Sequence, residues 1–81
     1  MSSTPLKILP FAQARDLLGF SEKNLVLDPH STPRAILESI QPGFTATHTT
    51  FRVALDEEYS SWDQPILNSQ VLAIIPPVSG G

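Results

Sequence analysis

Residues 71–81 read VLAIIPPVSGG, and this stretch decides both how the chain folds and what it offers to other molecules. The five apolar residues at 71–75 predict a strand. Because no polar residue interrupts them, we expect a central strand covered on both faces. Pro76 and Pro77 lack backbone donors, so sheet pairing is expected to stop before them. The last six residues are then expected to form an extended tail with a reach of about 20 Å.

Two glycines, Gly80 and Gly81, make that tail thin. A glycine has no Cβ, so this segment could pass a constriction that any side chain would block. An α-carboxyl group has a pKa near 3.5 and is ionised at neutral pH, which makes it a poor electrophile until it is activated. A Gly-Gly pair alone also fits an ordinary flexible terminus or linker. The uninterrupted order of strand, Pro-Pro, Val-Ser and Gly-Gly favours insertion into a partner.

Eighty-one residues predict one domain spanning residues 1–81, with a flexible N-terminus at 1–4 and the tail at 76–81. The net charge is −3, and the five lysines and arginines are scattered singly, which argues against nucleic-acid binding. No apolar run approaches the length of a membrane span, and no secretory signal is recognisable, so we expect a cytosolic protein.

The side chains offer little chemistry of their own. Cysteine is absent, which excludes thiol nucleophiles, thiolate metal sites and disulfides. His30 and His48 have no second strong ligand at metal-binding spacing, and both are expected to be ordinary surface or loop residues. No glycine-rich phosphate loop is present either. The sequence therefore predicts a protein that binds no metal or cofactor and is not an enzyme on its own.

Hydrophobic periodicity predicts an α+β fold, a mixed sheet with one main helix packed across it. The expected strands and helices, in chain order, are a strand from Leu6 that ends at Pro10, a helix at 12–18, a strand at 24–27, a helix from Thr32 to Gln41, a strand at 51–55 and a strand at 71–75. Gly19 is expected to cap the first helix, and Thr32 followed by Pro33 to start the second.

The remaining segments are expected to be loops. Residues 45–50 are polar, and the acidic Asp56-Glu57-Glu58 run suggests a solvated hairpin tip. Tyr59 and Trp62 then fall in an irregular connection. They suggest either an aromatic docking patch or simple packing of that connection.

Two motifs together resemble the family formed by the small subunits of molybdopterin synthase, which are ubiquitin-like β-grasp sulfur carriers. Residues 11–19, FAQARDLLG, resemble the family's aromatic-Ala-Gln-x-Arg-x-Leu-x-Gly signature, and residues 76–81, PPVSGG, resemble its C-terminal signature. The Glu58-Tyr59 pair is a weaker similarity. The chain departs from the family at Ser69-Gln70-Val71, where members carry a Gly-Asp-Glu-type turn.

The resemblance implies a chemistry for Gly81. A ubiquitin-activating-type adenylyltransferase and sulfurtransferase would use ATP and magnesium to adenylate its carboxylate, and sulfur from a persulfide donor would convert it to a thiocarboxylate. The large synthase subunit would then direct that sulfur onto cyclic pyranopterin monophosphate, in a complex that the family implies is a heterotetramer. Catalytic acids, bases and substrate-binding groups would lie on that partner.

The expected site residues follow from the same reading. Gly81 carries the sulfur, and the residues inserted with it are Pro76, Pro77, Val78, Ser79 and Gly80. Phe11, Arg15 and Ile75 are expected to dock against the partner, together with Val78. Ile74 is more consistent with the core than with an interface.

Three other functions remain open. The chain could be a sulfur carrier for thiamine synthesis or tRNA thiolation, or a ubiquitin-like modifier joined to lysines through Gly81. It could also be a plain interaction domain whose tail is idle. An independent enzyme is the weakest alternative, because no nucleophile and base are paired in the sequence.

Overall fold

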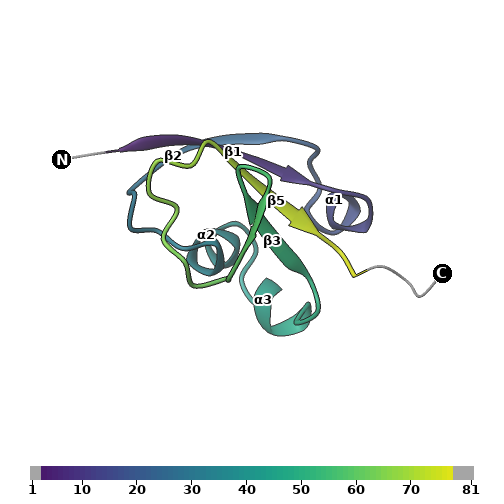
Figure 1. Cartoon of the computed structure of the whole chain (residues 1–81). Coiled ribbons are helices and arrows are strands. Elements are labelled where there is room, and N and C mark those ends of the chain that lie inside the picture. Colours follow the sequence, from purple (N-terminus) through teal and green to yellow (C-terminus); the bar gives the residue numbers. More distant parts are fainter. Residues whose placement is uncertain (1–2, 78–81) are drawn as a thin grey trace.

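The computed structural model describes residues 3–77 (Figure 1). Its helices and strands, in chain order, are β1 Thr4–Pro10, α1 Gln13–Leu18, β2 Lys23–Leu27, α2 Pro33–Ile40, α3 Phe44–Thr47, β3 Arg52–Leu55, β4 Glu58–Ser60 and β5 Val71–Ile75. None of these helices is long and apolar enough to cross a membrane.

The five strands form one mixed sheet in the order β2-β1-β5-β3-β4. β1 and β5 run parallel at the centre, and every other pair of neighbouring strands is antiparallel. Figure 1 shows α2 packed against one side of this sheet, with β5 ending on the same side of the molecule as α1. The predicted α+β arrangement, a β-grasp with one main helix across a mixed sheet, is confirmed.

The hydrophobic core lies between the sheet and the helices. Alternate strand residues point into it, and α2 contributes Ile36 and Leu37 while α3 contributes Phe44. The buried core residues are Leu6, Ile8, Ala14, Ile36, Leu37, Phe44, Phe51, Val53, Leu55, Ile66, Leu72 and Ile74. The inner face of the sheet is therefore the one that packs against the helices, and no helix of the described part of the chain covers the outer face.

The prediction that β5 is covered on both faces is therefore wrong. Leu72 and Ile74 are fully buried, whereas Val71, Ala73 and Ile75 are only half-buried. The apolar run has two separate causes: the inner residues fill the core, and the outer residues form an apolar surface. That outer surface is the part of the fold that bears on function.

β1 begins earlier than predicted. Thr4 pairs with Leu27 in β2, so it belongs to the sheet rather than to a flexible N-terminus at 1–4. At the other end β1 stops at Pro10, as predicted. β2 pairs with β1 only as far as Ile8. Pro10 has no backbone N–H, but this removes no hydrogen bond between β1 and β2 because their pairing has already ended.

Both predicted helix caps are confirmed. Gly19 follows α1 with a left-handed φ of 84°, and its N–H donates to the carbonyl of Arg15. The Thr32 hydroxyl accepts from the N–H of Ala35 at 3.2 Å, and Pro33 begins α2. These local signals were readable because each cap uses residues adjacent in sequence.

Two short elements were missed, α3 in the segment expected to be a polar loop and β4 in the connection after the acidic run. α3 depends on a distant side chain. The Glu38 carboxylate of α2 accepts from the Thr45 hydroxyl at 2.6 Å and from the N–H groups of Gly43 and Thr45, each at 2.8 Å. It thereby satisfies backbone donors at the start of α3 that the helix itself cannot pair.

These contacts make Glu38 a source of pH-dependent stability. The Thr45 hydroxyl first, and then the two backbone N–H groups, hold the pKa of Glu38 below its usual value. A carboxyl whose pKa is lowered in the folded state stabilises that state above its unfolded pKa, and the contribution is lost as pH falls through the folded value.

We expect Glu38→Gln to lower the free energy of unfolding at pH 7, and the difference from wild type to shrink below about pH 4. Urea unfolding at a series of pH values measures this. Glu22→Gln is the matched control, because Glu22 makes only an exposed ion pair with Lys7 at 3.7 Å. A Glu38→Gln difference that stays constant down to pH 3 would contradict the assignment.

Asp56 and Glu57 of the acidic run form a two-residue hairpin turn between β3 and β4, and Glu58 begins β4. The predicted solvated hairpin tip is confirmed. Asp56 and Glu57 are exposed and have positive φ values of 50° and 74°. The Asp56 carboxylate accepts from the N–H groups of Gln70 and Val71 at 2.9 and 3.0 Å, and the Asp56 N–H donates to the Val71 carbonyl. The turn is thus tied to the start of β5.

Asp56→Ala should lower the free energy of unfolding by about 2 kcal/mol, because two hydrogen bonds are lost and alanine tolerates a positive φ poorly. Asp56→Asn keeps an acceptor oxygen and tolerates this backbone, so it should lose less than half as much. Urea denaturation compares the two variants. Equal losses for alanine and asparagine would show that the carboxylate contacts do not hold this turn.

Candidate functional site

The tail leaves the sheet where β5 ends at Ile75. Pro76 and Pro77 follow outside any strand, as predicted, and Pro77 is exposed. The predicted insertion residues Val78, Ser79 and Gly80, and the predicted sulfur-bearing residue Gly81, lie outside the described residues. The structure therefore defines the base from which the tail departs.

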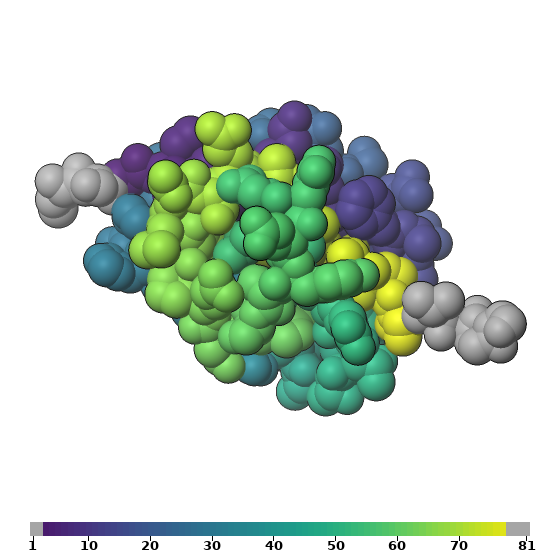
Figure 2. All heavy atoms as spheres, viewed as in Figure 1, coloured from purple at the N-terminus to yellow at the C-terminus, as the bar shows by residue number. Residues whose placement is uncertain are grey.

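A hollow of about 490 Å³ lies on the open face of the sheet beside this base. Its floor is β5, and its walls are the end of β1 and the β3–β4 hairpin. The residues that line it are Leu9, Phe11, Ala54, Asp56, Glu57, Tyr59, Val71, Ala73 and Ile75. In Figure 2, atoms of β5 (yellow) are visible between the β1–α1 segment (purple) and the hairpin (green).

Strand geometry explains why this hollow exists. Side chains of a strand alternate between the two faces, so Val71, Ala73 and Ile75 share the outer face. Ala54 of β3 pairs with Ala73, and two methyl side chains side by side leave a depression between larger neighbours. Most of the exposed lining is apolar, which suits a surface that another protein covers.

The predicted docking residues fall into different places. Phe11 is 48% exposed and lines the hollow, as does Ile75. Arg15 is exposed on α1 and is not among the lining residues. Ile74 is fully buried, which confirms that it belongs to the core. The structure thus places Phe11 and Ile75 on one hollow, whose lining does not include Arg15.

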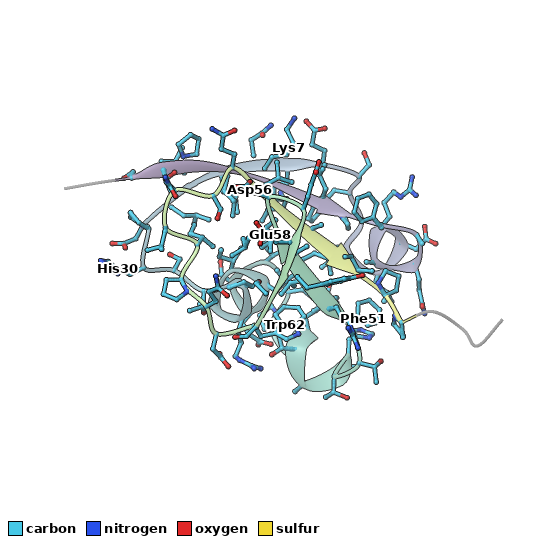
Figure 3. The ribbon with its side chains drawn as sticks, viewed as in Figure 1. Lys7, His30, Phe51, Asp56, Glu58 and Trp62 are labelled. Carbon is cyan, nitrogen blue, oxygen red and sulfur yellow. The ribbon has the colours of Figure 1, made fainter. Side chains whose placement is uncertain are left out.

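The two aromatic residues of the connection separate in the same way. Tyr59 is 69% exposed and lines the hollow, so its ring is available to a partner. Trp62 packs against the core, and its indole N–H donates to the carbonyl of Phe51 at 3.1 Å (Figure 3). Packing explains Trp62, while Tyr59 belongs to the candidate surface.

Charged groups stand at the two ends of the hollow. Near the tail base, the Arg52 guanidinium lies over the Tyr59 ring, with 5.7 Å between the guanidinium carbon and the ring centroid. A cleft of about 280 Å³ joins Thr50, Arg52 and Tyr59 to Ile75, Pro76 and Pro77. At the other end, Asp56 and Glu57 line the hollow itself.

No reactive constellation accompanies this surface. Within residues 3–77, no group of three or more histidine, aspartate or glutamate side chains is placed to hold a metal ion. His30 is exposed, and its backbone N–H donates to the Asp28 carboxylate (Figure 3). The His48 ring packs against the rings of Phe44 and Phe51, at centroid distances of 4.7 and 4.9 Å. The arrangement can hold a partner and direct the tail.

Several residues of this surface were missed by sequence reasoning. Leu9, Ala54, Val71 and Ala73 line the hollow, and Arg52 lines the neighbouring cleft. A signal for them existed. Arg52 and Ala54 alternate with the core residues Val53 and Leu55, which placed them on the outer face. The contiguous apolar run of β5 hid the same alternation.

Comparisons with known proteins give consistent results. A family model described as the ThiS family matches residues 8–81. The chain is 35% identical over 83 residues to a molybdopterin synthase sulfur carrier subunit from Arabidopsis thaliana, and the alignment covers 99% of this chain and 86% of that protein. It is 39% identical over 85 residues to the subunit of the same name from Dictyostelium discoideum, with 98% and 99% covered.

Among solved structures, SAMP1 from Haloferax volcanii is similar with a TM-score of 0.71. The identity is 19%, and the superposition covers 95% of this chain and 99% of that one. At that identity the likeness supports the fold alone.

Proposed function

This chain belongs to the ThiS family and has the ubiquitin-like β-grasp fold, and from that premise we propose that it is the sulfur carrier subunit of a molybdopterin synthase. The observation that carries the proposal is the extent of the similarity. Two sulfur carrier subunits align with nearly the whole chain, and the family match runs through Gly81. The open hollow at the tail base supplies a surface for the large subunit.

The proposed sulfur site is the carboxyl group of Gly81. An activating enzyme uses ATP and magnesium to join this carboxylate to AMP, and pyrophosphate leaves. A persulfide donor then attacks the acyl carbon and AMP leaves. Cleavage of the remaining S–S bond by a thiol gives the thiocarboxylate. The nucleotide and the metal act on the activating enzyme, so this chain needs only to present its terminus.

The tail residues serve delivery in this scheme. Pro76 and Pro77 end the sheet pairing and favour an extended chain, so the reactive terminus is held away from the domain. Gly80 and Gly81 allow the narrow end to enter a partner pocket. Enclosure brings the thiocarboxylate close to the pterin precursor and keeps out water that would hydrolyse it.

Docking on the sheet then positions the tail. The large subunit covers the hollow, and the apolar side chains of Phe11 and Ile75 are buried in that contact. Because Ile75 is both the last residue of β5 and part of the hollow, contact there fixes where the tail begins. Arg15 lies on α1 and does not line the hollow, so we place it at the edge of this interface.

Reconstitution tests the proposal. Thiocarboxylated protein is mixed with a large synthase subunit and cyclic pyranopterin monophosphate, and molybdopterin formation is followed; unloaded protein is the control. We expect product only with the loaded protein. Absence of product with a large subunit that works with another carrier would contradict the proposal. Sulfur transfer to a thiamine precursor or to tRNA instead would assign the chain to one of those pathways.

A further inference from the structure

We propose that opposite charges at the two ends of the hollow fix the direction in which the large synthase subunit lies across the sheet. The matching partner segment has an apolar side chain for the hollow, a carboxylate facing Arg52 and a basic group facing the Asp56–Glu57 turn. This inference rests on the proposed function and adds a requirement to it: the partner must bind in one orientation, with its tail pocket at the Arg52 end.

The positive end is held in place. Arg52 is the first residue of β3 and pairs with Ile75, the last residue of β5, so it lies beside the point where the tail departs. Its guanidinium rests on the Tyr59 ring, and it forms no ion pair within residues 3–77. A guanidinium that is exposed and ordered by an aromatic ring retains its donors for a carboxylate from outside.

The negative end is held by the backbone contacts of Asp56. Asp56 and Glu57 form the turn that follows β3, and four residues of strand separate Arg52 from Asp56 by about 13 Å. The Asp56 carboxylate is tied to the N–H groups of Gln70 and Val71, which prevents the turn from swinging freely. Glu57 follows it in the turn and also lines the hollow.

The position of the hollow identifies its occupant. A protein that encloses residues 78–81 has to approach the tail base, and Ile75, Pro76 and Pro77 share a cleft with Arg52 and Tyr59. Ile75 also lines the apolar hollow, so a surface that reaches the base continues onto the sheet. Apolar contact alone would permit several orientations, whereas opposite charges at the two ends favour one.

A charge-reversal series tests the polarity. Arg52→Glu lowers the net charge by two and Glu57→Lys raises it by two, so the double variant keeps the wild-type net charge of −3. The dissociation constant for the large subunit is measured for each variant. Each single reversal should weaken binding about tenfold, and the double variant about fiftyfold or more, since each exchanges an attraction for a repulsion.

This design separates polarity from net charge. If net charge alone steered the partner, the double variant would bind like wild type, and the proposal would be overturned. The losses should also shrink as salt rises from about 0.1 to 1 M, where the screening length falls from about 10 to 3 Å. Thermal melting of each variant confirms that it folds.

The matched control is Arg34→Glu with Asp63→Lys, which reverses an exposed ion pair whose arginine lies on α2, across the sheet from the hollow. Its binding should change less than twofold. Wild-type protein that fails to bind the large subunit would overturn the proposed function together with this inference. Wild-type binding that Arg52→Glu leaves unchanged would overturn the inference alone.

Discussion

Removal of Gly81 is expected to slow adenylation of the chain by its activating enzyme by about a hundredfold or more. Deleting one residue shortens the reach of the extended tail by about 3.3 Å. Displacement of a reacting group by even about 1 Å can lower a rate by about a hundredfold. The exchange of labelled pyrophosphate into ATP, catalysed by the activating enzyme in the presence of the chain, measures the step directly.

The control for this deletion is Ser79→Ala, which preserves the tail length and changes one hydroxyl. Its exchange rate should remain within about threefold of wild type, because the reactive carboxylate still reaches the same place. If the chain without Gly81 supported exchange as fast as wild type, the carboxylate of Gly81 would not be the group that is activated.

Substitution by alanine is expected to affect stability at Ile74 and partner affinity at Ile75. Ile74 is fully buried in the core, so Ile74→Ala should lower the free energy of unfolding by about 3 kcal/mol. Ile75 is half-buried on the outer face, and Ile75→Ala should cost less than about 1 kcal/mol in stability. Its effect should appear as a loss of affinity for the large subunit of about tenfold or more.

Urea denaturation and a binding titration on both variants measure this contrast. If Ile74→Ala does not fold, Ile74→Val provides the stability value, with an expected loss of about 1 kcal/mol. The result that would count against the account is an Ile75→Ala variant with unchanged affinity. The open face of the sheet would then not be the docking surface.

Much of the fold could be predicted because its signals are local. Thr32 and Pro33 predicted the start of α2, and Gly19 predicted the end of α1. The apolar run placed β5 correctly. α3 could not be predicted in this way, because its N–H groups are satisfied by Glu38, a residue of the preceding helix.

Some residues of the candidate site could be predicted from the sequence, and others could be found only from the fold. Phe11 and Ile75 were named from their positions near the tail, and the structure places both at one hollow. Arg52 was missed, since its meaning depends on the Tyr59 ring and on the pairing of β3 with β5. The order of strands in the sheet decides which residues of different strands meet on one face. That order could not be predicted from the single sequence.

The fold also explains how the base of the tail is held. β5 is the middle strand of the sheet, with β1 on one side and β3 on the other, so the base of the tail is held by two ladders of hydrogen bonds. Its inner residues anchor it in the core, and its outer residues are half-buried on the open face. For the proposed function, a base held in this way lowers the entropic cost of placing the terminus in a partner pocket.

Sulfur on Gly81 can be detected from the intact mass of the protein. The protein is incubated with ATP, magnesium, an activating enzyme shown to work on another carrier, and a persulfide donor. We expect a gain of about 16 Da, which corresponds to one oxygen exchanged for sulfur at a terminus whose glycines let it enter the enzyme. The gain should vanish when Gly81 is deleted. An unchanged mass under these conditions would show that Gly81 is not a sulfur carrier.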